Sequence, residues 1–257
     1  MDKQIERLIS EISATKYCAA FTGAGVSTLS GIQDFRGKNG LYTTNPEIYQ
    51  KMFDIEWFET DPSFYYDAAK DFIYGLDGKK PSIVHKVLAE LEKRGILKAL
   101  VTQNIDLLHQ KAGSERVIEV HGSPTVHYCM RCAGVRVGFE EVAALVQRGE
   151  MPRCPKCNRV LKPAITFFGE VLPTDAFAEA GNVAQACDLM LVLGSSLTVR
   201  PAAGIPRLVL SHGGKIVLVN DMQTYLDRHA LLRFNDLAEV FDALAEWLHP
   251  KGAGTAC

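Results

Sequence analysis

Five short apolar segments, each followed by small or polar residues, constrain the fold of this chain most strongly. Patterns typical of helices separate most of them along the sequence. Near-continuous apolar strands that alternate with helices are typical of a parallel sheet covered by helices on both faces. The sequence therefore predicts an α/β fold whose strands lie at residues 17–21, 97–102, 116–120, 188–193 and 215–219.

Helical periodicity accounts for much of the remaining sequence. Residues 2–13, 82–95 and 236–249 each carry an apolar stripe at helical spacing. Ser82 is placed to cap the second of these helices. By contrast, residues 39–80 are aromatic, irregular and interrupted by prolines. We expect this region to form short helices inserted into the α/β fold.

Small and polar residues gather directly after the predicted strands. In open parallel sheets, ligands bind at the carboxyl ends of the strands, so these residues would face one site. Their chemistry suits a single nucleotide. The segments concerned are Thr22-Gly23-Ala24-Gly25, Thr102-Gln103-Asn104-Ile105-Asp106, His121-Gly122, Gly194-Ser195-Ser196 and Asn220.

Residues 21–37, FTGAGVSTLSGIQDFRG, begin like a loop that binds the phosphates of a dinucleotide. Gly23, Ala24 and Gly25 would let the backbone approach a pyrophosphate. A dehydrogenase loop continues as G-x-G-x-x-G, with an acidic residue about 20 positions later that binds the adenosine ribose. Here the second half of that pattern is missing, and Arg36 follows in DFRG. The loop alone leaves open whether it serves hydride transfer or other nucleotide chemistry.

Four cysteines form two C-x-x-C pairs, Cys129 with Cys132 and Cys154 with Cys157. Thiolates at this spacing favour tetrahedral Zn²⁺, and a set without His, Asp or an open position indicates a structural ion. The gap between the pairs is slightly longer than the usual ribbon spacing of about 15–20 residues. A redox role is disfavoured because catalytic C-x-x-C pairs do not usually occur as a matched quartet. We expect a small zinc-ribbon module.

Charge and cysteine usage exclude several classes of partner. The formal net charge is -2 and the pI is about 6.4, so direct nucleic-acid binding is not expected. No apolar run reaches the length of a membrane span, and the first ten residues are too charged for a signal peptide. Seven cysteines, an odd number, argue against a disulfide framework. We therefore expect a cytoplasmic protein, and a chain this compact is compatible with a monomer.

A series of motifs occurs in one order over nearly the whole chain: GAGVSTLSGIQDFRG, TQNIDLLHQKAG, EVHGS, the two C-x-x-C pairs, FFGE, LGSSLTVRPAA and VN. Together they resemble the sirtuins, the NAD-dependent protein lysine deacylases, and especially the compact prokaryotic members. With this resemblance we expect a helical insertion at residues 39–80 and a small zinc-binding module at residues 123–162. The Rossmann-like NAD-binding domain would then comprise residues 1–38, 81–122 and 163–257.

The resemblance implies that NAD is consumed as a co-substrate. In sirtuins the acyl-lysine carbonyl oxygen attacks C1′ of the nicotinamide ribose and expels nicotinamide, and O-acetyl-ADP-ribose and free lysine are the products. By motif position His121 is the general base, a task that suits an imidazole with an ordinary pKa of about 6.5. Asn104 and Asp106, with Ile105, would meet the nicotinamide carboxamide and the reacting ribose. Gln103 would hold a ribose hydroxyl.

Further NAD contacts are implied for the glycine-rich loop and the segment after it. The backbone at residues 23–25 would approach the phosphates, and Thr28 would add a hydroxyl. Phe35 would cover the nicotinamide side and shield the reacting centre from water. Arg36 would pair with phosphate or orient the loop.

The carboxyl-terminal half supplies the remaining implied NAD contacts. Ser195 and Ser196 would contact phosphate or ribose, and Asn220 the adenosine ribose. Leu237, near the start of the last predicted helix, would meet the adenine region through its backbone.

The acyl-lysine substrate should lie between FFGEV and SLTVRP. Extended peptides commonly add as strands to exposed backbone. By resemblance, the modified lysine would enter a tunnel lined by Phe168 and Val199, with Thr166 and Val171 nearby. Acetyl-lysine proteins or peptides are thus the expected partners.

The sequence departs from the sirtuin pattern at several positions. Gln33 stands where Pro is frequent, which predicts a less stiff loop. Arg200 stands where an aromatic residue is common, and Thr166 makes one tunnel wall more polar. Members that remove acidic acyl groups pair a Tyr with an Arg three residues later, whereas that spacing here gives Tyr66 and Ala69. A succinyl carboxylate would then lack a partner, so we expect neutral acyl groups, acetyl first.

Three other functions fit part of the pattern. Protein mono-ADP-ribosylation would use the same NAD pocket with a different acceptor. A dehydrogenase is disfavoured by the incomplete phosphate loop. A zinc-ribbon binding module with a vestigial nucleotide site is disfavoured because a pure binder has no need of His121 and Asp106 together.

Overall fold

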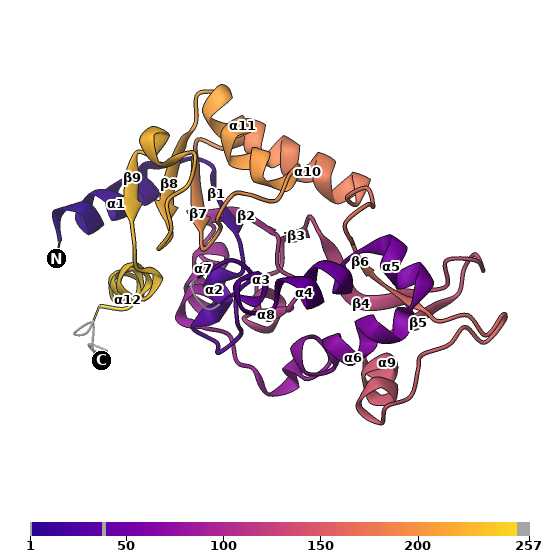
Figure 1. Cartoon of the computed structure of the whole chain (residues 1–257). Helices are drawn as coiled ribbons and strands as arrows, with labels where there is room; N and C mark the ends of the chain where they lie inside the picture. The colour runs from indigo at the N-terminus through magenta and orange to yellow at the C-terminus, as the bar shows by residue number, and fades with distance from the viewer. Residues whose placement is uncertain (1, 38–39, 251–257) are drawn as a thin grey trace.

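A six-stranded parallel sheet forms the larger part of the molecule (Figure 1). The computed structural model describes residues 2–37 and 40–250, so Cys257 and the predicted boundary between residues 38 and 39 lie outside the described residues. The predicted α/β fold is confirmed. The strands lie in the order β3 (Val117–Glu119), β2 (Leu97–Thr102), β1 (Cys18–Thr22), β7 (Leu189–Leu193), β8 (Lys215–Val219) and β9 (Leu232–Phe234).

The strand order reverses direction between β1 and β7. From β1 the chain continues to β2 on one side, and from β7 it continues to β8 on the other. Such a reversal opens a crevice beyond the carboxyl ends of the two central strands, which is the usual ligand site of this architecture. The glycine-rich loop after β1 and the Gly194-Ser195-Ser196 segment after β7 therefore meet at one point.

Helices cover both faces of this sheet, as the near-continuous apolar strands predict. In β1, Cys18 and Ala20 pack toward one face, whereas Ala19 and Phe21 pack toward the other. The first face is covered by α1 (Lys3–Ala14), α7 (Ile83–Lys93) and α12 (Leu237–Leu248), and the second by α10 (Thr174–Ala186) and α11 (Ile205–Ser211).

Polar side chains fix where several helices begin. Asp2 accepts a hydrogen bond from the amide of Gln4, and Asp236 caps α12 in the same way. Ser82 caps α7 as predicted, with His85 completing a reciprocal capping box. No helix in the described part of the chain is long and apolar enough to cross a membrane.

The region after the glycine-rich loop forms short helices, as its prolines and aromatic residues predict. They are packed around aromatic side chains, with the Phe58 ring centroid 5.5 Å from that of Phe167 and the Tyr65 centroid 5.2 Å from it. The helices are α3 (Leu41–Thr44), α4 (Pro46–Met52), α5 (Ile55–Thr60) and α6 (Pro62–Phe72), followed by a 3-10 turn at Leu76–Gly78.

A second, antiparallel sheet connects the cysteine cluster with the parallel sheet. Its strands lie in the order β5 (Arg136–Gly138), β4 (Gly122–Tyr128) and β6 (Lys162–Ile165). The helix α9 (Phe139–Gln147) follows β5 and packs its apolar side chains into the aromatic core of the short helices. The cysteine module and the helical insertion therefore share a hydrophobic core.

Candidate active site

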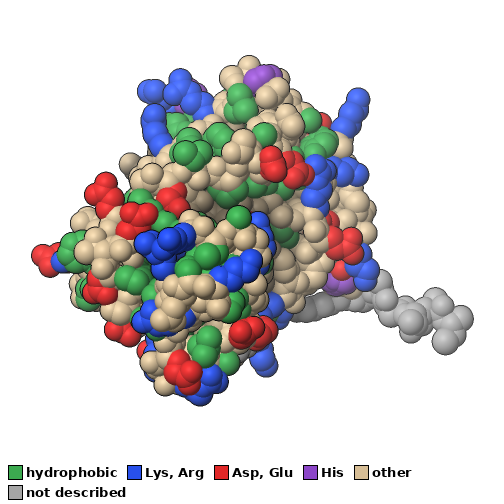
Figure 2. Space-filling view, turned by 90° about the vertical axis from the view of Figure 1, so that its right-hand side faces the viewer, with side chains coloured by type: hydrophobic (Ala, Val, Ile, Leu, Met, Phe, Trp, Pro, Cys, Tyr) green, Lys and Arg blue, Asp and Glu red, His purple; other side chains and the backbone are tan. Residues whose placement is uncertain are grey.

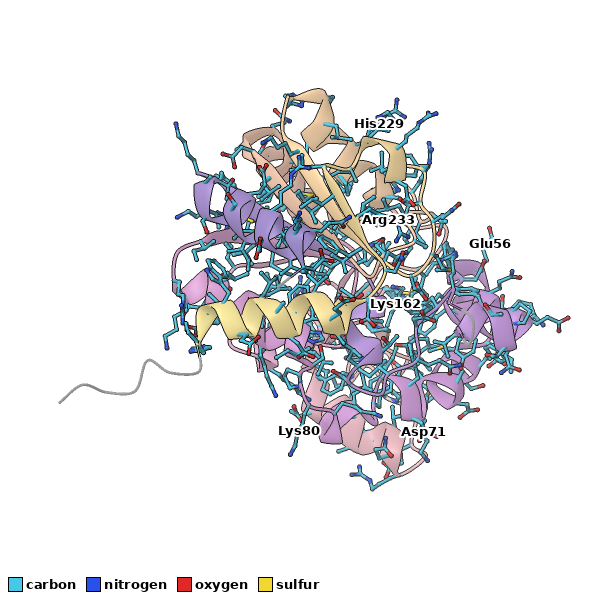
Figure 3. The ribbon with its side chains drawn as sticks, turned by 90° about the vertical axis from the view of Figure 1, so that its left-hand side faces the viewer. Glu56, Asp71, Lys80, Lys162, His229 and Arg233 are labelled. Carbon is cyan, nitrogen blue, oxygen red and sulfur yellow. The ribbon has the colours of Figure 1, made fainter. Side chains whose placement is uncertain are left out.

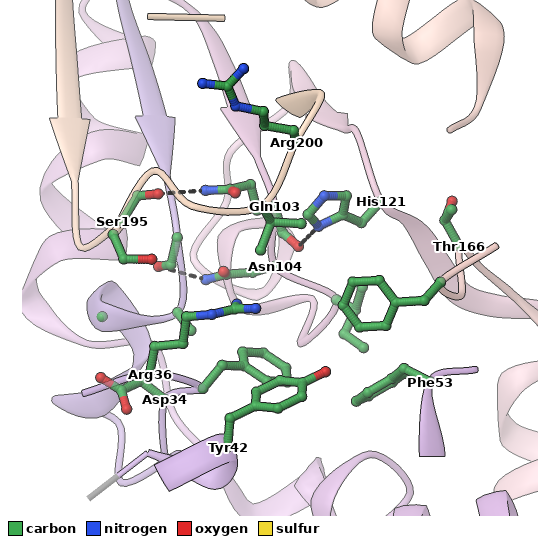
Figure 4. A pocket seen from close by; sticks show the side chains of 18 of the residues that line it. Asp34, Arg36, Tyr42, Phe53, Gln103, Asn104, His121, Thr166, Ser195 and Arg200 are labelled. Carbon is green, nitrogen blue, oxygen red and sulfur yellow. Dashed lines mark hydrogen bonds between the residues drawn. The ribbon is translucent and has the colours of Figure 1, made fainter. Parts of the chain in front are cut away.

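A cavity of about 380 Å³ opens at the carboxyl ends of β1 and β7, between the two sheets and the short helices. Loops from both sheets and from the helical region line it (Figure 4). A space-filling view shows a hollow on the side of the molecule that carries the antiparallel sheet, with apolar side chains gathered in it (Figure 2). The cavity thus has a polar side formed by strand ends and an apolar side.

All but three of the predicted NAD and substrate residues line this cavity. They come from segments far apart in the sequence, which the parallel strands bring to one edge of the sheet. The lining residues among them are Gly23, Ala24, Gly25, Phe35, Arg36, Gln103, Asn104, Ile105, His121, Thr166, Phe168, Val171, Ser195, Ser196, Val199 and Asn220.

The loops after β1 and β7 pack against each other backbone to backbone. A Cβ atom added to Gly23 would lie 2.7 Å from the carbonyl oxygen of Gly194, and one added to Gly25 would lie 2.7 Å from the Gly194 Cα. Gly194 itself has a φ of 58°, in the left-handed region. The packing of the two loops therefore requires glycine at these positions.

Gln103 links the segment after β7 with the segment after β3. Its side-chain amide donates to the Ser195 hydroxyl at 2.8 Å, and its backbone carbonyl lies 3.0 Å from Nδ1 of His121 (Figure 4). A carbonyl can only accept, so Nδ1 of His121 carries the proton and Nε2 is left as the basic nitrogen. Burial lowers the pKa of His121, opposed by this hydrogen bond, so the ring is neutral at neutral pH.

Asn104 is buried and held by the glycine-rich loop. Its side-chain amide donates to the Gly23 carbonyl at 3.2 Å and to the Ser27 hydroxyl at 3.3 Å. Its backbone amide donates to the Thr102 hydroxyl at 3.0 Å. These contacts fix the turn after β2 against the turn after β1.

Three predicted site residues do not line the cavity. The Asp106 carboxylate accepts hydrogen bonds from the Ser27 hydroxyl at 2.6 Å and from the Leu108 amide at 2.9 Å, at the start of α8 (Leu108–Lys111). Thr28, the last residue of α2 (Gly25–Thr28), is exposed, and its hydroxyl donates to the Gly25 carbonyl. Leu237 packs against the core beneath α12. Their contacts with NAD stay predictions.

The structure adds cavity residues that the sequence analysis did not assign. Tyr42 and Phe53 come from the aromatic insertion, whose unusual density of rings was the available signal. Phe167 adds a third ring, and Asp34 and Asp221 add carboxylates. Burial raises the pKa of Asp34 and the nearby charge of Asp221 raises it further, although the Gly37 amide opposes both.

Tyr66 and Ala69, by contrast, lie outside the cavity lining. Both are buried in the helical region, and the Tyr66 hydroxyl donates to the Leu161 carbonyl at 2.6 Å. The assignment of Tyr66 and Ala69 by their spacing therefore stays a prediction. Phe53, Ile165 and Phe167 line the apolar side of the cavity.

The four cysteines of the two C-x-x-C pairs come together as predicted. Their sulfur atoms all lie within 4.8 Å of one another, with Cys129 and Cys157 at 3.5 Å. Sulfur ligands of a tetrahedral zinc, each at about 2.3 Å, lie about 3.8 Å apart. The Cys132 amide lowers the pKa of Cys129 to about 6, whereas hydrogen bonding with Cys157, with burial second, raises that of Cys132 to about 12. Thiolates are the form in which cysteine binds a metal ion, so metal binding to this cluster would release protons.

Comparison with known proteins decides the family. A model of the Sir2 family matches residues 23–201. An NAD-dependent protein deacetylase of Thermotoga maritima is 42% identical over 232 residues, covering 90% of this chain and 93% of that protein. The chain belongs to the Sir2 family. An NAD-dependent protein deacylase of Thermococcus kodakarensis, a further member, is 41% identical over 212 residues, covering 81% of each.

Solved structures of the Sir2 family share this fold. A complex described as Sir2 with a p53 peptide and NAD⁺ matches with a TM-score of 0.85 at 39% identity, covering 96% of this chain and 97% of that one. A Sir2 variant with a deacetylated p53 peptide and 3′-O-acetyl-ADP-ribose matches with a TM-score of 0.88 at 40% identity, covering 95% and 98%. The match extends over both sheets and is not confined to the nucleotide-binding half.

Proposed function

We propose that this protein is an NAD-dependent protein lysine deacetylase that forms nicotinamide, O-acetyl-ADP-ribose and free lysine. The observation that carries the proposal is the neutral His121, held by the Gln103 carbonyl inside a cavity with nucleotide-binding loops on one side and an apolar wall on the other. Relatives and structural neighbours of this chain are named for the same activity or hold its product.

NAD supplies the bond that breaks, between nicotinamide and the ribose C1′. We place its phosphates at the loop of residues 23–25 and at Ser195 and Ser196, which meet at the switch point of the sheet. Asn220, at the end of β8, would bind the adenosine ribose, and the backbone of Leu237 the adenine region. Thr28 would reach the phosphates only with its hydroxyl released from Gly25.

The nicotinamide ring would lie against the turn after β2. Asn104 and Ile105 already line the cavity there, and Gln103 offers its amide to a ribose hydroxyl. Asp106 would have to turn from Ser27 to accept a hydrogen bond from the carboxamide. Phe35 would exclude water from the reacting ribose, with Arg36 beside it.

His121 would act after nicotinamide has left. With its Nδ1 proton engaged by Gln103, its free Nε2 can accept a proton from a ribose hydroxyl. The deprotonated hydroxyl then takes the acyl group, and water completes release of lysine. A base whose pKa is below its ordinary value stays unprotonated at neutral pH, as this step requires.

The acyl-lysine peptide would enter along the exposed side of the cavity. Phe168 and Val171 are exposed there, and Val199 and Thr166 complete the wall. The Phe168 backbone is already paired, since its amide donates to the Phe53 carbonyl at 2.6 Å. The peptide would therefore pair with backbone beyond Phe168, as an added strand. Because the inner wall is apolar, an acidic acyl group would be left unpaired, and we expect acetyl to be preferred.

The cysteine cluster would hold one structural Zn²⁺. The four sulfurs lie within 4.8 Å of one another, which suits tetrahedral coordination. The six described cysteines are free, which suits a reducing compartment, and we expect a cytoplasmic monomer that does not bind nucleic acid directly.

Nicotinamide release tests the proposal. Incubation with NAD and an acetyl-lysine peptide should give nicotinamide and O-acetyl-ADP-ribose only when the peptide is present. His121→Ala should lower O-acetyl-ADP-ribose formation by about 10²-fold or more, because a positioned general base contributes about 10²–10⁴-fold. Nicotinamide release without peptide would instead indicate ADP-ribosyl transfer or NAD hydrolysis, and NADH absorbance would indicate a dehydrogenase.

A further inference from the structure

Lys162 is a charged side chain in the interior of the protein, only 1% exposed. Its Nζ lies 2.8 Å from Oε2 of Glu170 and donates to the carbonyls of Ile165 at 2.8 Å and Pro163 at 3.2 Å. The ammonium also lies 4.1 Å from the centroid of the Phe167 ring. Figure 3 shows Lys162 within the molecule, whereas Glu56 and Asp71 lie at its periphery.

The stability of the fold does not by itself explain a buried ammonium paired with the partly exposed Glu170. Withdrawing an ammonium from water is costly, and a well-packed apolar residue at such a position is often equally stable or more so. The neighbouring His127 does not compensate the charge. Its Nε2 lies 2.7 Å from the Tyr74 hydroxyl, and burial, with the charge of Lys162 adding to it, lowers its pKa to about 4. Glu170 is therefore the carboxylate that Lys162 meets.

The pair ties together both ends of one cavity wall. Lys162 begins β6 and holds the Ile165 carbonyl at the end of that strand. Glu170 Oε2 accepts a hydrogen bond from the Phe167 amide at 2.7 Å while it pairs with Lys162. Lys162 itself does not line the cavity, but the segment that it and Glu170 hold does, without interruption over residues 165–171.

We propose that Lys162 and Glu170 are positioning residues that hold residues 165–171 in the conformation that receives the acyl-lysine peptide. The inference rests on the proposed function, because it takes Thr166, Phe168 and Val171 as the peptide side of the cavity. The pair acts through these residues and does not touch the reacting atoms. The polar contacts of the pair are with residues 163, 165 and 167 and not with the loops after β1 and β7, so we expect its loss to affect peptide binding more than NAD binding.

Removal of the pair should separate peptide binding from NAD binding. Lys162→Met removes the ammonium at similar side-chain length, and Glu170→Gln removes the charge while it keeps an acceptor for the Phe167 amide. Each should raise the Kd and KM for an acetyl-lysine peptide about tenfold, because small misplacements of positioning groups cost up to about 10²-fold. The KM for NAD should change much less than the KM for the peptide.

The double variant Lys162→Met/Glu170→Gln controls for unfolding of the single variants. It removes both charges, so neither is left without its partner in the protein interior. The double variant should bind the peptide no more weakly than the weaker-binding single variant, because both substitutions remove the same interaction. Leu244→Ala, in the core beneath α12, is the matched control: it should lower the melting temperature without a change in peptide Kd. An equal loss of peptide and NAD binding, or an equal effect of Leu244→Ala, would overturn the proposal.

Hydrogen–deuterium exchange separates this proposal from the proposed function. In both single variants the amides of residues 166–171 should exchange faster, while those of β1 and β7 keep their protection. Unchanged exchange in a folded Lys162→Met protein would show that the pair does not hold the segment. If exchange changes but the wild-type protein releases no peptide-dependent nicotinamide, the proposed function fails and the clamping of the segment stands.

Discussion

At the residue scale, His121 takes its tautomer from a backbone carbonyl, where many catalytic histidines use a carboxylate. A carboxylate partner would stabilise the imidazolium and raise the pKa, whereas burial here outweighs the Gln103 carbonyl and lowers it. Asp106, which was predicted at the nicotinamide, is engaged by Ser27 and Leu108. The site is therefore arranged to keep the base neutral.

The pH dependence of turnover follows from this arrangement. Because the base must be unprotonated and its pKa is below the ordinary value of about 6.5, the rate should be constant around pH 7 and fall only as the pH drops below that value. The measurement is kcat/KM for the acetyl peptide, followed by O-acetyl-ADP-ribose formation between pH 5 and pH 8. An acid limb centred above pH 7 would contradict the assignment of His121 as this base.

The acid limb must be distinguished from unfolding. Burial lowers the pKa of His85 to about 4, and that of His109 well below its usual range. These folded-state pKa values are below the unfolded value of about 6.5, so the unfolded chain binds more protons. The free energy of unfolding therefore decreases as the pH falls below about 6.5. Melting temperatures recorded at each pH provide the control, and only points at which the protein is folded count.

Individual residues also show where prediction from sequence ended. The positions after the strands were predictable, because parallel strands bring their carboxyl ends to one edge. The direction of a side chain within a turn was not, since Asp106 is turned away by the Ser27 hydroxyl, a partner from a different loop. Tyr66 likewise could not be placed, because its hydroxyl bonds to Leu161, far along the chain.

At the element scale, the turns after β1 and β7 act as one unit. Gly25→Ala would bring a Cβ to 2.7 Å from the Gly194 Cα, a backbone atom that cannot move aside independently. The substitution should therefore destabilise the fold by about 1–3 kcal/mol, as overpacking does, and should weaken NAD binding because the loops separate. Urea denaturation and calorimetric titration with NAD measure the two effects.

Gly181→Ala is the matched control for that substitution. Gly181 lies inside α10, and a Cβ there would meet no atom within 4 Å. Alanine should stabilise this helix by about 0.5–1 kcal/mol and leave NAD binding unchanged. If Gly25→Ala behaved in the same way, the close packing of the two loops would not be what requires glycine.

Elements with a clear hydrophobic period were predicted well, and those without one were not. The long apolar runs of β7 and β8 predict buried central strands, which the structure confirms. β9 is a three-residue edge strand, and its position depends on pairing with β8 rather than on its own sequence. α9 was missed inside the cysteine module, because the zinc spacing dominated the interpretation of that region.

At the scale of the whole molecule, the antiparallel sheet joins two distant sites. The cysteine cluster lies beyond one end of β4 and β6, and His121 and Thr166 flank the other end. The Thr166 amide donates to the His121 carbonyl at 2.8 Å, so the two strands hold base and peptide wall together. We propose the residue limits 39–80 and 123–162 for the two inserted modules, although α9 and α6 share one core across them.

Metal removal should therefore act at a distance. If the cluster holds structural Zn²⁺, Cys154→Ser or a chelator should lower the melting temperature by about 5 °C or more, given that 1 kcal/mol corresponds to about 2–4 °C for a chain of this size. Peptide turnover should fall with it, because β4 and β6 lose their anchor at the far end. The chelator should have no further effect on the Cys154→Ser protein, which shows that both act on one site. Unchanged melting after zinc has been removed quantitatively, as measured by atomic absorption, would exclude a structural role for the ion.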